Sequence, residues 1–236
     1  MSNYIEVKND KSIIINDSYQ NVSFDYSVAV RGTNKVDDSK GYRFSDISSG
    51  SYLWYSSTNT IILYFHVPAD KIIGIYCPSP NFGISPMRLY NGEWLQVYVK
   101  NRAGGSARDI LNVDLILYYF SYKSSNQRNG LQVMNASGQC IFNSNLKYLR
   151  VIDYILQRND SDPNDLGTRS YNCNIALMVG CLEHRVGSKH SKDQYVYFPN
   201  HKSFGVYVYD DYVSSDGTSK EVYGCTSIVV INTDNY

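Results

Sequence analysis

Short runs rich in Val, Ile, Tyr and Phe recur along the whole sequence, and clusters of Asn, Asp, Ser and Gly separate them. Apolar residues at the spacing i, i+3, i+4 and i+7, which marks an amphipathic helix, are almost absent. Frequent short apolar runs with polar turns between them are typical of a β-sandwich or β-barrel. The pattern predicts an all-β fold with strands at Tyr4–Val7, Ser12–Ile15, Val22–Val30, Ser51–Tyr55, Thr60–His66, Ile72–Cys77, Trp94–Lys100, Val113–Tyr122, Leu131–Asn135, Cys140–Asn143, Tyr148–Ile155, Asn174–Val179, Gln194–Phe198, Gly205–Tyr209 and Thr226–Ile231.

Alternation of side-chain type is clearest in Gly205–Tyr209, where two valines alternate with two tyrosines. Successive side chains of a strand point to opposite faces of its sheet. Val206 and Val208 are therefore expected on one face, and Tyr207 and Tyr209 on the other.

Two stretches of the chain, 4–22 and 130–149, match in kind along their length when one residue is inserted at Ser137 or Gly138. Each reads as a strand, a turn and a second strand, and Gly138 suits a turn because glycine tolerates positive φ. Any two hairpins share part of such a pattern, but here the asparagine and apolar positions agree together. The matching pairs are Ile5/Leu131, Val7/Val133, Asn9/Asn135, Ile14/Ile141, Ile15/Phe142, Asn16/Asn143, Tyr19/Leu146 and Val22/Leu149.

An internal repeat of this kind predicts two tandem β-sandwich-like domains. The segment 123–129 contains no apolar residue, and a strand pattern restarts directly after it. Polar segments of this kind often link domains. We therefore expect one domain at 1–123 and a second at 124–236.

The charge balance argues against nucleic acid as a partner. Lys and Arg number 22, Asp and Glu also number 22, and no basic cluster occurs, whereas nucleic-acid binders present basic patches. The best candidate for a membrane span, Ile61–Val67, is far too short to be one, and no signal-peptide pattern follows Met1. We expect a protein that is made in a cytoplasm, is not exported by a signal peptide and does not insert into membranes.

Tyrosine is the most over-represented residue, with 23 copies against 8 Phe and 2 Trp. Its flat apolar ring and polar tip suit half-exposed strand faces and protein contact surfaces. Tyr118, Tyr119, Tyr207 and Tyr209 are the candidate contact residues, although tyrosines can also simply cover a sandwich face. Trp54 and Trp94 are the candidates for stacking on a glycan, and burial in the core is the favoured interpretation of both.

No pattern for a metal or cofactor site is present. The five cysteines are odd in number, widely spaced and without a CxxC pair, so they are expected to be small buried hydrophobes. The four histidines form no HExxH motif. The acidic segment Asp160–Asp165 could suggest calcium, but a solvated loop is favoured.

Patterns for catalysis are also missing. Ser85 lies in Gly83–Pro86, which is interpreted as a turn and not as the elbow of a nucleophile. The adjacent carboxylates Asp37–Asp38 and Asp210–Asp211 would point to opposite faces of a strand, whereas a glycosidase needs two carboxylates that converge. The sequence predicts that the chain is not an enzyme.

The segment Gly130–Ser144, with Lys147–Val151 after it, resembles a motif of tail and virion proteins from tailed bacteriophages. In that motif a Gly-Leu-Gln-Val-x-Asn-Ala-Ser-Gly hairpin precedes an apolar pair, an Asn-Ser or Asp-Ser turn and an Arg-Val strand. The N-terminal stretch containing Asn16–Tyr19 looks like a second copy without the turn glycine. The resemblance implies membership of a phage particle and brings no catalytic residues.

Taken together, these features predict a tail-associated structural component of a bacteriophage virion, located at a tail tip, fibre or adaptor. It would act as a homo-oligomer through contacts with itself and with other virion proteins. The alternative is a module on the phage surface that attaches to the host by binding a receptor or carbohydrate. An enzyme such as a glycan hydrolase is the least favoured interpretation, because no convergent carboxylates are recognisable.

Overall fold

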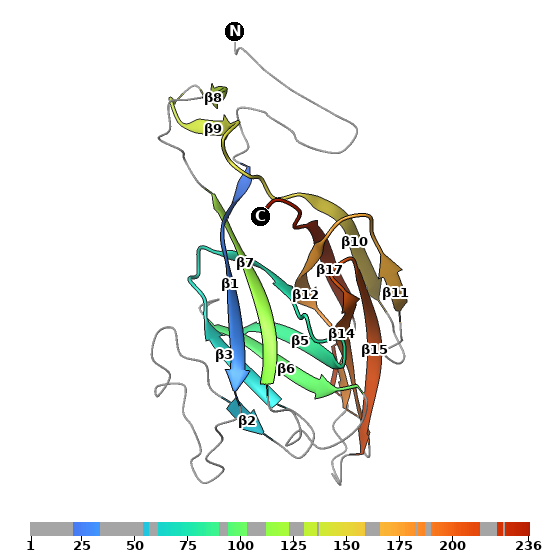
Figure 1. Ribbon diagram of the computed structural model, residues 1–236. Coiled ribbons are helices and arrows are strands. Elements are labelled where there is room, and N and C mark those ends of the chain that lie inside the picture. Colours follow the sequence, from blue (N-terminus) through green and yellow to red (C-terminus); the bar gives the residue numbers. More distant parts are fainter. Residues whose placement is uncertain are drawn as a thin grey trace.

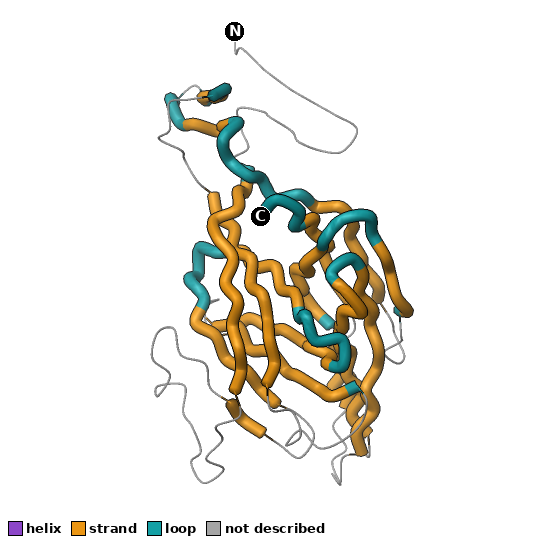
Figure 2. The backbone as a smooth tube through the Cα atoms, in the orientation of Figure 1, coloured by secondary structure: helices purple, strands orange, loops and turns teal. Residues whose placement is uncertain are grey.

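The computed structural model describes residues 21–33, 54–56, 61–89, 94–102, 112–122, 130–135, 137–158, 166–182, 184–186, 190–212, 221–223 and 225–236. These residues form β-strands, turns and loops, and none of them is helical. The predicted all-β class is confirmed (Figures 1 and 2). The strands predicted at Tyr4–Val7 and Ser12–Ile15, and the segment 123–129, lie outside the described residues.

Two large antiparallel sheets and one separate hairpin make up the fold (Figure 1). The six-stranded sheet has the order β1 (Val22–Thr33), β7 (Asn112–Tyr122), β4 (Ile72–Tyr76), β12 (Ile175–Cys181), β17 (Cys225–Asn232) and β10 (Val151–Arg158). The nine-stranded sheet has the order β11 (Gly167–Ser170), β15 (Ser203–Tyr212), β14 (His190–Asn200), β5 (Phe82–Leu89), β6 (Trp94–Asn101), β3 (Ile61–His66) and β2 (Trp54–Ser56), with β13 (His184–Val186) between β14 and β16 (Glu221–Tyr223). The hairpin consists of β8 (Gln132–Met134) and β9 (Cys140–Asn143).

Each large sheet is built from both halves of the chain, the first with residues up to 123 and the second from 124 on. The strands of the two halves follow in matching order. The first half contributes β1, β7 and β4 to one sheet and β5, β6 and β3 to the other. The second half contributes β10, β17 and β12, and then β14, β15 and β11, in the corresponding places. The halves join where β4 pairs with β12 through Ile75 and Leu177, and where β5 pairs with β14 through Ile84 and Val196.

Two β-bulges agree with the sequence alignment of the halves. The β1–β7 ladder shifts register at Asp25, and the β10–β17 ladder shifts at Ile152. Asp25 comes three residues after Val22, and Ile152 comes three residues after Leu149, which is the residue aligned with Val22 in the repeat. A bulge inserts one residue and bends its strand, so the same local distortion recurs at the same aligned position. The division into domains at 1–123 and 124–236 stays a prediction.

A single apolar core contains residues from both halves and from both large sheets. Its largest fully buried side chains are Phe120, Phe198, Phe204, Leu63, Ile84, Leu115, Leu117, Ile175, Leu177 and Ile228. Burial of each such side chain stabilises the fold by about 1.5–3 kcal/mol. The cluster of buried side chains therefore continues across the junction of the halves.

Aromatic contacts also cross between the halves. The Tyr76 ring stacks on His201 with 4.0 Å between ring centroids and meets Phe198 edge-on at 5.0 Å. At the end of the chain, the Tyr236 ring stacks on Phe24 at 4.7 Å. The C-terminus accordingly lies against the body, near the start of β1 (Figure 1). These pairs attach the β14–β15 turn and the chain end to strands of the first half.

One expectation for the first half is wrong. Ser85 and Pro86 do not form a turn but lie inside β5, which pairs with β6 along its whole length. Proline cannot donate a hydrogen bond to a sheet ladder. Pro86 is tolerated because the other neighbour of β5, the strand β14, pairs with it only through Ile84. The short strands β11, β13 and β16 were not predicted either.

We predict that a protease site engineered at Asn126 will give two fragments that remain associated. Both sheets and the core run across the halves, so separating them would expose apolar surface and open the β4 and β5 edges. Size-exclusion chromatography before and after addition of denaturant checks this. Two fragments that separate and stay folded without denaturant would show two independent domains instead.

The His201 contact predicts a loss of stability at acidic pH. Burial lowers the pKa of His201, although the nearby Asp234 carboxylate opposes this, and Tyr76 and Tyr118 are its other titratable neighbours. The folded state thus favours neutral imidazole. Its contribution is present above the unfolded pKa of about 6.5 and is lost as the pH falls through the lower folded value.

We therefore expect the Tm to fall more between pH 7 and pH 5 in the wild type than in His201→Gln. The other three histidines are common to both proteins and cancel in this comparison. Equal slopes in the two proteins would contradict the assignment.

Candidate functional site

The two edges of the six-stranded sheet are long, whereas those of the nine-stranded sheet are short. Among the described residues, β1 pairs along its length only with β7, and β10 pairs only with β17. These edge strands contain 12 and 8 residues, against 4 and 3 residues in β11 and β2. Short edges limit unwanted pairing, but a long edge presents a row of backbone donors and acceptors to another chain.

Apolar side chains are exposed along β10. Tyr154 is 53% exposed and Leu156 is 64% exposed, and Val151 and Ile152 are exposed as well. Ile155, between the two, is buried in the core, so β10 alternates between a core face and an apolar outer face. Neither Lys nor Pro, the residues that commonly protect an edge strand, occurs in β10.

Asp153 links the β10 edge to the nine-stranded sheet. Its Oδ2 accepts hydrogen bonds from the Tyr171 hydroxyl at 2.7 Å and from Arg169 of β11 at 3.2 Å. Its Oδ1 accepts the backbone N–H of Tyr154 at 2.8 Å. The hydrogen bond from Tyr171, assisted by Arg169, holds the pKa of Asp153 below its usual value. The carboxylate therefore connects β10 of one sheet to the β11 region of the other. It also accepts a hydrogen bond from one N–H of the edge strand.

A bulge also marks the other edge strand. Asp25, at the β1 bulge, is buried and accepts hydrogen bonds from Lys71 at 2.8 Å and from the Ser121 hydroxyl at 2.7 Å. Tyr26 and Val28 of β1 are exposed, and the Tyr26 ring stacks on Tyr119 at 4.6 Å. The start of β1 also meets the second half through the bridge between Ser23 and Tyr148. Part of β1 is thus already engaged within the chain.

Tyrosines cover one face of the nine-stranded sheet. On β14 and β15, Tyr195 is in register with Tyr207, and Tyr197 is in register with Gly205. A Cβ at Gly205 would lie 2.5 Å from the Tyr197 ring, and a Cβ at Gly83 would lie 2.2 Å from the Tyr207 hydroxyl oxygen. The rings therefore pack directly on strand backbone at Gly205 and Gly83, because a residue with a Cβ would collide with them.

Basic side chains cover these rings in turn. The Arg102 guanidinium lies 3.3 Å from the centroid of the Tyr197 ring, and the Lys100 ammonium lies 3.9 Å from that of Tyr209. Such cation–π contacts are worth about 0.5–2 kcal/mol. Burial raises the pKa of Tyr207, whose hydroxyl has no hydrogen-bond partner among the described residues. Tyr207 and Tyr209, two of the candidate contact residues, are engaged in packing within the chain.

The other candidate residues are dispersed. Tyr118 and Tyr119 are adjacent on β7 and each is 6% exposed, because the second half and β1 pack against them. Trp54 of β2 is in register with Leu63, and Trp94 of β6 is in register with His66. These two positions fall on opposite faces of the sheet, since Leu63 and His66 are an odd number of residues apart on β3. The structure does not gather these candidates into one site.

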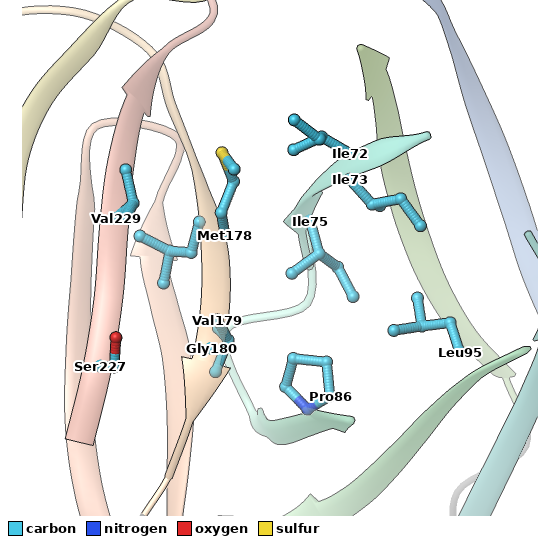
Figure 3. A pocket seen from close by; sticks show the side chains of 11 residues that line it. Ile72, Ile73, Ile75, Pro86, Leu95, Met178, Val179, Gly180, Ser227 and Val229 are labelled. Atoms are coloured by element: carbon cyan, nitrogen blue, oxygen red, sulfur yellow. The ribbon is translucent and has the colours of Figure 1, made fainter. Parts of the chain in front are cut away.

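A small apolar pocket of about 260 Å³ lies at the junction of the halves (Figure 3). It opens beside the single bridge between β4 and β12, where the two strands cease to pair. One hydroxyl, from Ser227, is the only polar side-chain group in its lining. The pocket can accept a small apolar group but offers no ionisable side chain for chemistry. Its lining residues are Ile72, Ile73, Ile75, Pro86, Leu95, Leu177, Met178, Val179, Gly180, Ser227 and Val229.

The β8–β9 hairpin adopts the turn that its motif indicates. The Asn135 side-chain oxygen accepts the N–H groups of Ser137 and Gln139, at 3.2 and 2.8 Å. Gly138 has a φ of 77°, in the left-handed region that glycine adopts without strain. The hairpin extends from the sandwich (Figure 1) and exposes Leu131 and Met134.

Cysteine, metal and membrane features are limited in the described part of the chain. All five cysteines are free thiols, and burial raises the pKa of Cys77 to about 12, which keeps it protonated at neutral pH. No cluster of three or more His, Cys, Asp or Glu side chains that could hold a metal occurs among the described residues. The same residues contain no helix long and apolar enough to cross a membrane.

We predict that Gly83→Ala destabilises the protein by about 1–3 kcal/mol, because the new methyl group displaces the Tyr207 ring. Tyr207→Phe is the matched control. It keeps the ring and removes a buried hydroxyl that lacks a partner, so its stability should stay within about 1 kcal/mol of wild type or rise. Urea unfolding of both variants checks this. A Gly83→Ala protein as stable as wild type would show that the ring moves without cost.

Comparison of the chain with family models, curated proteins and solved structures finds no match.

Proposed function

We propose that this chain is a structural component of a bacteriophage particle, associated with the tail, and that it works by assembling with other protein chains. The observation that carries the assembly role is the exposed apolar face of the long edge strand β10. The assignment to a phage particle rests on the motif at Gly130–Ser144, which resembles tail and virion proteins.

The physical argument concerns hydrogen bonds and apolar surface together. Among the described residues, β10 pairs only with β17, so the other side of this eight-residue strand presents N–H and C=O groups beside exposed Tyr154 and Leu156. Monomeric proteins usually protect such an edge with charge, proline or extreme shortness. In β10 a bulge at Ile152 and the Asp153 carboxylate, which caps one N–H, protect the start of the strand, and the uncharged residues Tyr154–Gln157 follow them. An edge of this kind is suited to strand addition by a partner chain.

The alternative function, binding of a host receptor or glycan, has less support from the described residues. Sugar stacking needs an open aromatic face. The Tyr197 and Tyr209 rings are covered by Arg102 and Lys100, and the side chains of Trp54 and Trp94 lie outside the described residues. We therefore favour the assembly role over the binding of a receptor or glycan.

We predict that purified phage particles contain several copies of this chain. Quantitative mass spectrometry of particles banded on a density gradient measures the copy number against a known capsid protein. Presence of the chain only in the soluble fraction of the lysate would contradict the proposal. A separate binding assay tests the attachment alternative. Binding of the purified chain to host polysaccharide, together with its absence from particles, would favour that alternative.

A further inference from the structure

We propose that two copies of this chain pair through β10, antiparallel and about a two-fold axis at Ile155, so that the six-stranded sheets of both copies become one continuous sheet. This inference rests on the proposed assembly function and names the partner of the β10 edge as a second copy of the chain. The distribution of side chains along β10 carries it.

The self-complementarity of β10 depends on its register. In an antiparallel pair, directly opposite residues share a face, so pairing about Ile155 keeps the core faces of both sheets on the same side. It places Tyr154 opposite Leu156 of the second copy, on the exposed face, and Asp153 opposite Gln157, on the core face. Apolar side chains then meet apolar side chains, and a carboxylate meets an amide.

Neighbouring registers lack this match. Pairing centred on Tyr154 would set the Asp153 carboxylate opposite the apolar Ile155. Pairing centred on Leu156 would set Tyr154 opposite Arg158. Only the register about Ile155 satisfies both faces and opposes no like charges, which destabilise a sheet when they are directly opposite.

Pairing would exchange the hydrogen-bond partners of Asp153 and of the Tyr154 N–H in a defined way. The N–H of Tyr154 donates to Asp153 Oδ1 at 2.8 Å, which shows that this N–H points away from β17 and toward the open edge. On pairing, the N–H passes to the carbonyl of Leu156 in the second copy. Asp153 Oδ1 then becomes available to the side-chain amide of Gln157 from that copy. Each donor and acceptor that loses one partner gains another.

The area available indicates a weak, reversible pair. Val151, Ile152, Tyr154 and Leu156 leave from about 75 to about 125 Å² exposed each. The two copies together could then bury at most roughly 800 Å² of this surface, less than the 1,200 Å² or so of a stable interface. Such a contact forms at high concentration or where neighbouring contacts hold the chains together, as within a particle.

The chain already contains two contacts of this type. Its halves join by antiparallel edge pairing, with Ile75 opposite Leu177 in one sheet and Ile84 opposite Val196 in the other. An apolar pair thus marks each junction, and Ile155 opposite Ile155 would mark a third. β1 is the poorer candidate edge, because its start pairs with Tyr148 and its Tyr26 ring stacks within the chain.

A charge-swap series at β10 tests the register. Wild type should self-associate in sedimentation equilibrium runs extending to millimolar concentration. The double variant Tyr154→Lys with Leu156→Lys sets lysine opposite lysine twice, and its association should weaken at least tenfold. The double variant Tyr154→Glu with Leu156→Lys sets opposite charges across the same two pairs, and association should return.

Controls separate folding from pairing. Both positions are exposed, so the variants should keep the wild-type Tm, and Ser170→Lys on the exposed strand β11 should change neither Tm nor association. A wild-type chain that stays monomeric at millimolar concentration overturns the pairing, as does undiminished association of the Lys/Lys variant. If the chain is nevertheless found in particles, only this inference fails. Absence from particles refutes the proposed function itself.

Discussion

The antiparallel pairing that joins β4 to β12 and β5 to β14 is the interaction on which the rest of the structure depends. Without it, β4 and β12 in one sheet and β5 and β14 in the other would each lose a neighbouring strand. With it, two sheets run through the whole molecule, and the side chains between them form one apolar cluster. The pairing is brief, with a single bridge in each sheet, so packing across the junction must supply much of its strength. The stacking of Tyr76 on His201 is part of that packing, and the apolar pocket lies where the β4–β12 ladder stops.

The same constraint, that backbone groups need partners, separates the inner from the outer edges of the six-stranded sheet. The inner edges meet each other within the chain. At the outer edges, β1 is partly engaged through Ser23 and Tyr26, whereas β10 pairs, within the described part of the chain, only with β17 and exposes apolar side chains. Asp153 joins the two sheets at that edge and caps the N–H of Tyr154. Such an edge leaves a place on which another strand can add, as the proposed assembly requires.

The surplus of tyrosine has more than one physical role. Tyr118 contacts His201 of the second half, and Tyr119 stacks on Tyr26 of β1. Tyr197 and Tyr207 pack on strand backbone at Gly205 and Gly83, and Arg102 lies over both rings. Tyr154 stays exposed on the β10 edge. The ring suits all these places because its apolar body packs while its hydroxyl tolerates water or a polar neighbour. Composition could not say which tyrosines are packed within the chain and which stay exposed.

Alternation and turn chemistry determined much of the local structure. The all-β class, the separation of valine from tyrosine faces in 205–209, and the turn at Asn135 and Gly138 all follow from residues close together in the chain, and so could be predicted. The two bulges, which were not predicted, fall three residues after Val22 and Leu149, the last aligned pair of the repeat. Only the tertiary structure decided that Pro86 lies in a strand, that Tyr118 is buried and that β10 forms an open edge. These depend on which distant strands become neighbours, because a proline is tolerated, a ring is covered and an edge is left open only by what packs beside it.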